Sequence, residues 1–240
     1  MQLGLCSKEG NMRYLITVLI AVLAGGLAWC TTSETLSVKI RLFHILSGEE
    51  QDNYQSIPLK TVHVAIVAVC VSLSSFFAMN SVLATTTDWI AVSKATITLL
   101  CLVGAGCFDF RQKRIPNFFP VLLALSAVVL LASGVIAQRD NAVVQITSSA
   151  IASIGCGVVL VLAAVITKEG IGFGDIKLIC AVALMMGMYV VLETIFFGAV
   201  CCSVFTIVVL IGKKDKNSKS VPFAPFLLIG YIVTLCMNNF

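Results

Sequence analysis

The sequence predicts an all-α membrane protein, a polytopic helical bundle with about eight transmembrane helices. Of its 240 residues, 59% are hydrophobic and only 12% are charged, whereas about a quarter of the residues in a soluble domain carry charge. The mean hydropathy is +1.02, and the apolar residues form runs too long for the strands of a soluble protein. Because a membrane-spanning helix needs about 20 apolar residues, the chain is expected to fold within a bilayer.

Eight apolar runs qualify as spans. In chain order they cover residues 14–31, 62–84, 89–108, 117–138, 143–166, 175–189, 190–211 and 222–238. The first run lacks the small-residue cleavage site of a signal peptide, so it is expected to remain as a span. The sixth and seventh are separated only by the weak break Gly187-Met188-Tyr189. If that break is not a turn, the count falls to seven.

The positive charges fall on alternate connections between the spans. Twelve of the sixteen Lys and Arg residues lie in or beside four of these connections: Lys39, Arg41 and Lys60, then Arg111, Lys113 and Arg114, then Lys168 and Lys177, then Lys213, Lys214, Lys216 and Lys219. Since Lys and Arg are enriched in cytoplasmic loops, these four connections are predicted to be cytoplasmic. The eight-span count then places both ends of the chain outside the cytoplasm.

Composition also excludes several kinds of site. No basic stripe alternates with aromatic residues, so nucleic-acid binding has no support. The ten cysteines are mostly single and form no CxxC pair, which is typical of small buried side chains and not of a zinc site or a disulfide framework. Neither a metal nor another cofactor is expected.

Two aspartates lie at the ends of predicted spans, where a carboxylate is costly and is by default a functional-site candidate. Asp109 closes the third span and Asp175 opens the sixth, 66 positions later. With the predicted orientation, both lie at a similar depth on the cytoplasmic side. Two neighbouring carboxylates can share one proton and activate a water molecule. Glu193, near the outer end of the seventh span, is expected to have an interfacial or packing role.

Glycines alternate through the approach to Asp175, at Gly170, Gly172 and Gly174. Glycine adopts backbone conformations closed to other residues and lets another backbone come close. Such a loop suits an enzyme that holds an extended peptide against its carboxylates. A flexible membrane hairpin is the simpler interpretation of the same pattern, and both interpretations stay open at this point.

Prolines mark the beginnings of two spans. Pro116 suits the first turn of the fourth span, where its missing N–H is no loss. Pro222 and Pro225, at the head of the last span, predict an irregular start. Irregular backbone at membrane depth persists only where it packs within protein or lines a cavity. This segment therefore either closes the site from a third side or merely begins the last helix.

Taken together, three segments resemble the signatures of the prepilin peptidases, which are GxGD-type aspartic proteases of the bacterial inner or cytoplasmic membrane. They are Asp109 with Arg114-Ile115-Pro116-Asn117, then Gly172-Phe173-Gly174-Asp175-Ile176-Lys177-Leu178, then Val221-Pro222-Phe223-Ala224-Pro225-Phe226-Leu227. The resemblance covers about residues 89–238. It implies a helical bundle with its active site at the cytoplasmic edge. It also implies two domains, a two-span region with a short cytoplasmic loop (1–88) and a six-span peptidase domain (89–240).

The resemblance makes Asp109 and Asp175 the catalytic pair. One would act as general base on the lytic water while the other, protonated, polarises the scissile carbonyl. Which does which stays open, because coupled carboxylates titrate as a pair. The remaining candidates for binding the substrate or shaping the site are Gly172, Gly174, Lys177, Arg114, Pro116, Asn117, Pro222 and Pro225. The implied partners are type IV prepilins or pseudopilins, together with membrane lipid.

The N-terminal part departs from the longer members of that family. Those members carry a cytoplasmic loop with two paired-cysteine motifs that bind zinc, and they also methylate the new N-terminus of the product. Here residues 32–61 contain no cysteine, so zinc binding there is not expected and N-methylation is in doubt.

Three other functions compete with a prepilin peptidase. A presenilin-like or signal-peptide-peptidase-like protease should carry YD and PAL motifs, and neither is present. A transporter or channel using paired carboxylates as a cation or proton site should show internal repeats or matched broken helices, and the sequence shows no duplication. A non-catalytic assembly factor on the same scaffold is disfavoured by the two intact aspartates. The pilin system and the oligomeric state are left open by the sequence.

Overall fold

Every regular element that the structure describes is an α-helix. The structure is a computed structural model that describes residues 15–26, 28, 61–85, 88–136, 142–167, 172–212 and 222–237. After the helix Leu15–Gly26 come α3 (Thr61–Thr85), α4 (Trp89–Gln112), α5 (Phe118–Ile136), α6 (Ala142–Thr167), α7 (Phe173–Met186), α8 (Met188–Gly212) and α9 (Ala224–Met237). Each predicted span overlaps with one of these helices, so the predicted all-α membrane bundle is confirmed.

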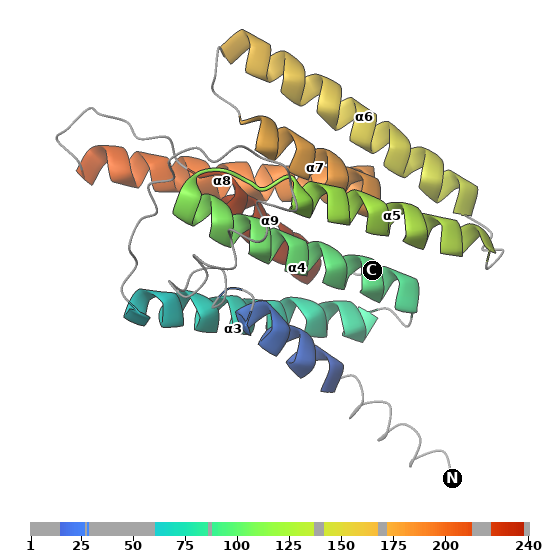
Figure 1. Ribbon diagram of the computed structural model, residues 1–240, viewed down its shortest axis with the longest axis horizontal. Coiled ribbons are helices and arrows are strands. Elements are labelled where there is room, and N and C mark those ends of the chain that lie inside the picture. The colour runs from blue at the N-terminus through green and yellow to red at the C-terminus, as the bar shows by residue number, and fades with distance from the viewer. Residues whose placement is uncertain are drawn as a thin grey trace.

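The helices differ in length. Four described segments are long and apolar enough to cross a membrane, Trp89–Phe110, Phe118–Ile136, Val143–Thr167 and Met188–Val208. By contrast, α7 and α9 have 14 residues each. At 1.5 Å per residue such a helix is about 21 Å long, which is shorter than the roughly 30 Å of a hydrocarbon core. Both short helices begin at the same end of the bundle (Figure 1).

The weak break between the sixth and seventh spans is a turn made by one residue. Gly187 separates α7 from α8, and its φ of +86° lies in the region that favours glycine. Its N–H donates to the Ala183 carbonyl over 2.9 Å, which ends α7. Beyond it, α8 runs back along α7 in the opposite direction (Figure 1). This reversal supports eight spans over seven.

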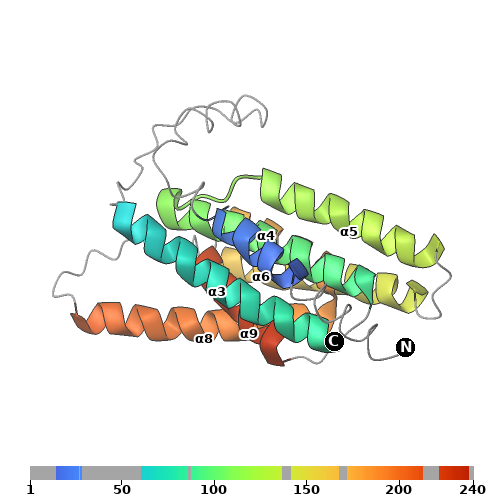
Figure 2. The same ribbon diagram turned by 90° about the horizontal axis from the view of Figure 1, so that it is seen from below.

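Because successive helices run in opposite directions, one end of the bundle gathers one set of helix termini. Here α4, α6 and α8 end while α5, α7 and α9 begin, towards the left of Figure 1. Figure 2 shows the same arrangement for α4, α5 and α8. We call this end the Asp end, since Asp109 is in the last turns of α4 and Asp175 in the first turn of α7. The connections predicted to be cytoplasmic are the ones that join helices at the Asp end.

The helices pack in two groups. In the first, α9 packs against α8, α4 and α3. Tyr231 of α9 is fully buried there, and its hydroxyl donates to the Ala95 carbonyl over 3.3 Å. In the second group, α7 packs against α5 and α6, where Ser153 Oγ donates to the Cys180 carbonyl over 3.0 Å. Since α4 and α7 pack only sparsely on each other, the two aspartates belong to different groups. The division of the chain at residue 88 stays a prediction.

Replacing Gly230 with alanine should force α8 and α9 apart. A Cβ atom at this position would lie 2.6 Å from the Gly198 backbone nitrogen, and backbone cannot swing aside as a flexible side chain can. Overpacking usually costs about 1–3 kcal/mol, and we expect Gly230→Ala to lose about 2–3 kcal/mol of unfolding free energy. Denaturant unfolding in detergent micelles measures this loss.

Gly155→Ala is the matched control, because nothing lies within 4 Å of a Cβ atom built on this helical glycine. It should gain about 0.5–1 kcal/mol from better helix propensity. Equal stability of Gly230→Ala and the unchanged protein would contradict the close crossing of α8 and α9.

Candidate active site

Asp109 is held by the end of one helix and the beginning of another. It lies in the last turns of α4, which stops where Lys113 adopts a left-handed conformation (φ 55°) and donates its N–H to the Asp109 carbonyl over 2.8 Å. The Asp109 residue is only 5% exposed. Its carboxylate Oδ2 accepts a hydrogen bond of 3.0 Å from the backbone N–H of Ala224, the first residue of α9. The contact joins positions 115 residues apart.

The start of α9 explains why a carboxylate is favourable there. Phe223 caps this helix, since its carbonyl accepts hydrogen bonds from the N–H groups of Phe226 and Leu227. The N–H groups of the first helical turn have no acceptor within their own helix, and Asp109 supplies one for Ala224. A negative charge at a helix N-terminus also interacts favourably with the helix dipole. The Asp109 carboxylate therefore stabilises the junction of α4 and α9.

The predicted irregular start of the last span is limited to the residues before Ala224. Pro225 lies in the regular first turn of α9, where a missing N–H is no loss. The backbone of α4 comes close to this turn at Gly106, where a Cβ atom would lie 3.4 Å from Pro225 Cα. Pro222 precedes the helix and is partly buried. The start of α9 thus forms a third side of the site. The sequence pattern alone did not decide between this role and that of simply beginning the last helix.

Asp175 lies in the first turn of α7, where its N–H donates to the Gly172 carbonyl over 3.0 Å. A Cβ atom at position 172 would lie 3.2 Å from Asp175 Oδ2, so glycine at this position leaves that side of the carboxyl open. Asp175 Oδ1 is buried, and it has no hydrogen-bond partner among the described residues. The two carboxyl groups are thus held differently, since Asp109 has a backbone donor.

The two carboxyl groups are close enough for the charge of Asp109 to act on Asp175. The structure therefore brings to one place two residues that are remote in sequence and belong to different helix groups. Like charges in a water-poor interior repel strongly, and a carboxyl pair in this relation can hold one proton between its members. Such a pair can supply both a base and an acid to a reacting water molecule.

The other candidates lie in the connection between α4 and α5 and in the first turns of α7. Lys177 Nζ donates a hydrogen bond of 3.0 Å to Asn117 Oδ1. Gly174 abuts Ile115, so that a Cβ atom at position 174 would lie 3.2 Å from Ile115 Cβ. Arg114 and Pro116 belong to the same connection, with Arg114 exposed. In this arrangement Lys177 and Asn117 contact each other and bind the connection to α7.

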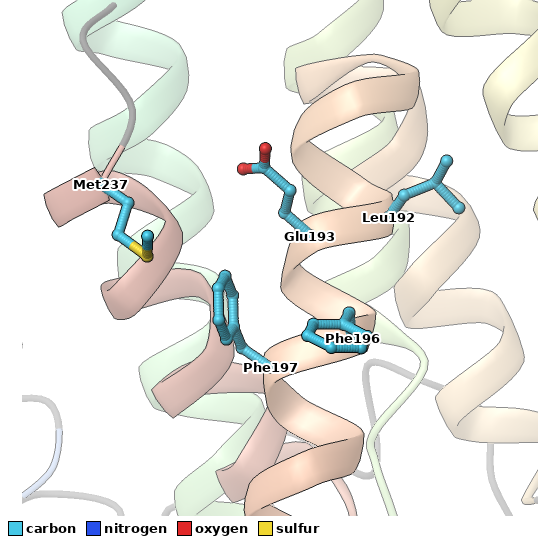
Figure 3. A pocket seen from close by; sticks show the side chains of 5 residues that line it. All are labelled: Leu192, Glu193, Phe196, Phe197 and Met237. Atoms are coloured by element: carbon cyan, nitrogen blue, oxygen red, sulfur yellow. The ribbon is translucent and has the colours of Figure 1, made fainter.

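Glu193 lies in α8 at the opposite end of the bundle from the aspartates. It lines a pocket of about 390 Å³ together with Leu192, Phe196, Phe197 and Met237. Figure 3 shows its carboxyl group between α8 and the last turn of α9. The expected packing or interfacial role of Glu193 stays a prediction.

Among the described residues, no group of three or more His, Cys, Asp or Glu side chains is arranged to hold a metal ion. The cysteines among the described residues are free, and Cys101, Cys107 and Cys156 are buried, as small apolar side chains would be. Cys70 and Cys236 differ from that expectation because they are exposed on the apolar outer surface of the helices.

Comparison with known proteins identifies the segment that carries both aspartates. Residues 95–207 match the model of the type IV leader peptidase family. This part of the chain is therefore similar to that family. The predicted resemblance to prepilin peptidases is thereby confirmed.

Several curated relatives match part of this chain. A protein named prepilin leader peptidase/N-methyltransferase from Pectobacterium carotovorum is 30% identical over 73 residues, which are 30% of this chain and 26% of that protein. A protein of the same name from Aeromonas salmonicida is 32% identical over 69 residues, which are 28% of this chain and 24% of that protein. One from Xanthomonas campestris is 27% identical over 150 residues, 60% of this chain and 50% of its own. The chain thus spans about a quarter to a half of the length of these relatives. No solved structure matches it significantly.

The two aspartates should differ in what they contribute to stability. Asp109→Ala removes the acceptor of the Ala224 N–H and leaves a buried donor unsatisfied, which costs about 1–2 kcal/mol of unfolding free energy. Asp175→Ala removes a buried oxygen that has no hydrogen-bond partner among the described residues, so it should be neutral or stabilising. Thermal unfolding of both purified variants in the same detergent measures the difference. A larger loss of stability for Asp175→Ala than for Asp109→Ala would contradict this difference between the two carboxyl groups.

Proposed function

We propose that this chain is a membrane aspartic endopeptidase that removes the leader peptides of type IV prepilins or pseudopilins, with Asp109 and Asp175 as its catalytic pair. One observation carries the proposal: two carboxyl groups 66 positions apart converge at the Asp end. Both lie within the segment that matches the leader peptidase family. The family match also supports a peptidase over a transporter that uses paired carboxylates as an ion site.

The proposed reaction uses the pair as base and acid. The ionised carboxylate removes a proton from a water molecule, whose oxygen attacks the scissile carbonyl carbon. The protonated carboxyl group donates its proton to the carbonyl oxygen, which gives a tetrahedral intermediate. Collapse of this intermediate breaks the C–N bond: one carboxyl group donates its proton to the leaving amine, while the other carboxylate takes a proton from a hydroxyl of the intermediate, so that the pair again holds one proton.

Glycine at position 172 supports an approach of the substrate backbone from that side of Asp175. Gly172 is exposed, and the absence of a side chain leaves Asp175 Oδ2 open towards it. The scissile carbonyl must come within hydrogen-bond reach of the carboxyl pair, about 3 Å. A carbonyl inside a helix is already engaged by its own helix, so we infer that the substrate is bound in an extended conformation around the cleavage point.

We further propose that the site faces the cytoplasm from the bacterial inner, or cytoplasmic, membrane. The connections at the Asp end are those that carry most of the lysines and arginines, including Lys113 and Arg114 of the α4–α5 connection. Such an orientation suits a prepilin, whose short basic leader stays in the cytoplasm while its apolar helix lies in the bilayer.

We assign only the peptidase reaction to this chain. The curated relatives are named as peptidase and N-methyltransferase together, but residues 32–61 contain none of the paired cysteines of the longer family members. Most of that segment lies outside the described residues, so the assignment depends on sequence alone.

Asp109→Asn and Asp175→Asn should each abolish cleavage, because an amide can neither accept the proton of the lytic water nor donate the proton of a carboxylic acid. We expect at least a roughly 1,000-fold loss in the rate of processing of a co-expressed prepilin, in line with the loss of an essential acid or base. Gel mobility of the processed and unprocessed prepilin measures it.

The control is the amount of each variant in isolated membranes, which should equal that of the unchanged protein since asparagine is nearly isosteric with aspartate. Glu193→Gln serves as the matched carboxyl-to-amide change away from the site and should process the prepilin normally. Processing at the normal rate by either aspartate variant would refute the aspartyl mechanism.

A further inference from the structure

The connection between α4 and α5 contacts both helices that carry the aspartates, α4 and α7. It comprises residues 113–117, which we call the strap. At one end, the Lys113 N–H donates to the carbonyl of Asp109 itself over 2.8 Å. At the other end, Asn117 Oδ1 accepts the hydrogen bond from Lys177 Nζ, two residues beyond Asp175. The strap is therefore attached to α4 at one aspartate and to α7 next to the other.

The middle of the strap also contacts α7. Ile115 packs against Gly174, the residue directly before Asp175, and a Cβ atom there would approach Ile115 Cβ to 3.2 Å. A larger residue at position 174 would thus push the strap away from α7. Pro116 fixes its own φ angle, which reduces the conformational freedom of this short segment. The strap therefore contacts the beginning of α7 at two places, through Ile115 and through Asn117.

Direct packing between the helices is too sparse to fix the separation of the aspartates. Within the described part of the chain, α4 contacts α7 much less than it contacts α9 or α5. The helix that packs substantially on both α4 and α7 is α5, and α5 begins at Phe118, directly after Asn117. The strap is hence the covalent link between α4 and the helix that positions α7.

We propose that the strap sets the separation of Asp109 and Asp175, with Asn117 and Lys177 as positioning residues for the reaction. This inference rests on the proposed function for its kinetic consequence but not for its structural one. The exposed hydrogen bond between Lys177 and Asn117 contributes little to overall stability, so its role is local. A displacement of about 1 Å at a reacting group is enough to reduce a rate about 100-fold.

The kinetic test uses Asn117→Leu, which removes the acceptor, Lys177→Met, which removes the ammonium group, and the double variant. Each single change should lower kcat for prepilin cleavage by about 10- to 100-fold while KM stays within about twofold. The double variant should be no worse than the poorer single variant, because all three lose the same contact. Lys177→Arg keeps a donor at this position and should restore most of the rate.

Ser203→Ala is the matched control, since its exposed hydroxyl donates to the Ala199 carbonyl of its own helix, over 2.7 Å. It should leave kcat and KM unchanged. A raised KM with unchanged kcat for Asn117→Leu and Lys177→Met would show that Asn117 and Lys177 bind substrate directly, and the positioning role would be wrong. Losses that multiply in the double variant, or no loss at all, would also overturn it.

The structural test does not depend on any activity. Spin labels attached through keto-bearing aromatic residues at Phe110 and Phe173, which are 46% and 73% exposed, report the separation of α4 and α7 next to the aspartates. Pulsed EPR should give a broader distance distribution in Asn117→Leu than in the otherwise unchanged labelled protein. An unchanged distance distribution would contradict the proposal that the strap sets the separation of the aspartates. If the distribution broadens while the unchanged protein cleaves no prepilin, the proposed function fails and the strap stands.

Discussion

The structure depends on the hydrogen bond between the Asp109 carboxylate and the backbone N–H of Ala224. A carboxylate within a membrane is expensive unless donors or opposite charges compensate it, and a helix N-terminus offers unpaired N–H groups together with a favourable dipole. By ending α4 and beginning α9 at the same point, the fold supplies this compensation from the backbone. The bond also joins distant parts of the chain, and it fixes the depth at which α9 begins.

The second aspartate is held less completely, and the proposed function gives this asymmetry a meaning. Asp175 has a favourable position in the first turn of α7, but one of its oxygens is buried without a hydrogen-bond partner among the described residues. Active sites commonly keep such unsatisfied groups because the missing partner is the reacting molecule. The fold thus stabilises one carboxyl group of the pair and keeps the other available.

Much of the architecture follows from hydropathy and charge. Apolar runs of about 20 residues predict the helices, and the alternation of lysine and arginine predicts which helix ends lie together. The pairing of Asp109 with Asp175 follows from that alternation, because an outward-to-inward span ends where an inward-to-outward span begins. Gly187 illustrates the limit of hydropathy: one residue with positive φ makes a full reversal, although the apolar run scarcely pauses there.

The partners of the aspartates are hidden from sequence reasoning for a physical reason. The donor to Asp109 is a backbone N–H, which every residue except proline carries, so no side-chain pattern marks Ala224. The backbone of α4 approaches α9 at Gly106, yet a glycine in an apolar run has no distinctive signal. The contact between Lys177 and Asn117 joins residues 60 positions apart, and only the packing of α5 on α7 brings them together.

The central claim is that Asp109 and Asp175 form one site acting on one peptide bond. The most direct measurement is the affinity of a prepilin-derived peptide in which a hydroxyl-bearing tetrahedral carbon replaces the scissile carbonyl. Because such a transition-state analogue binds through both carboxyl groups, its affinity should fall about 100-fold or more in either Asp-to-Asn variant, while an uncleavable substrate analogue with an intact carbonyl loses much less. Undiminished affinity of the tetrahedral analogue for either variant would contradict the account.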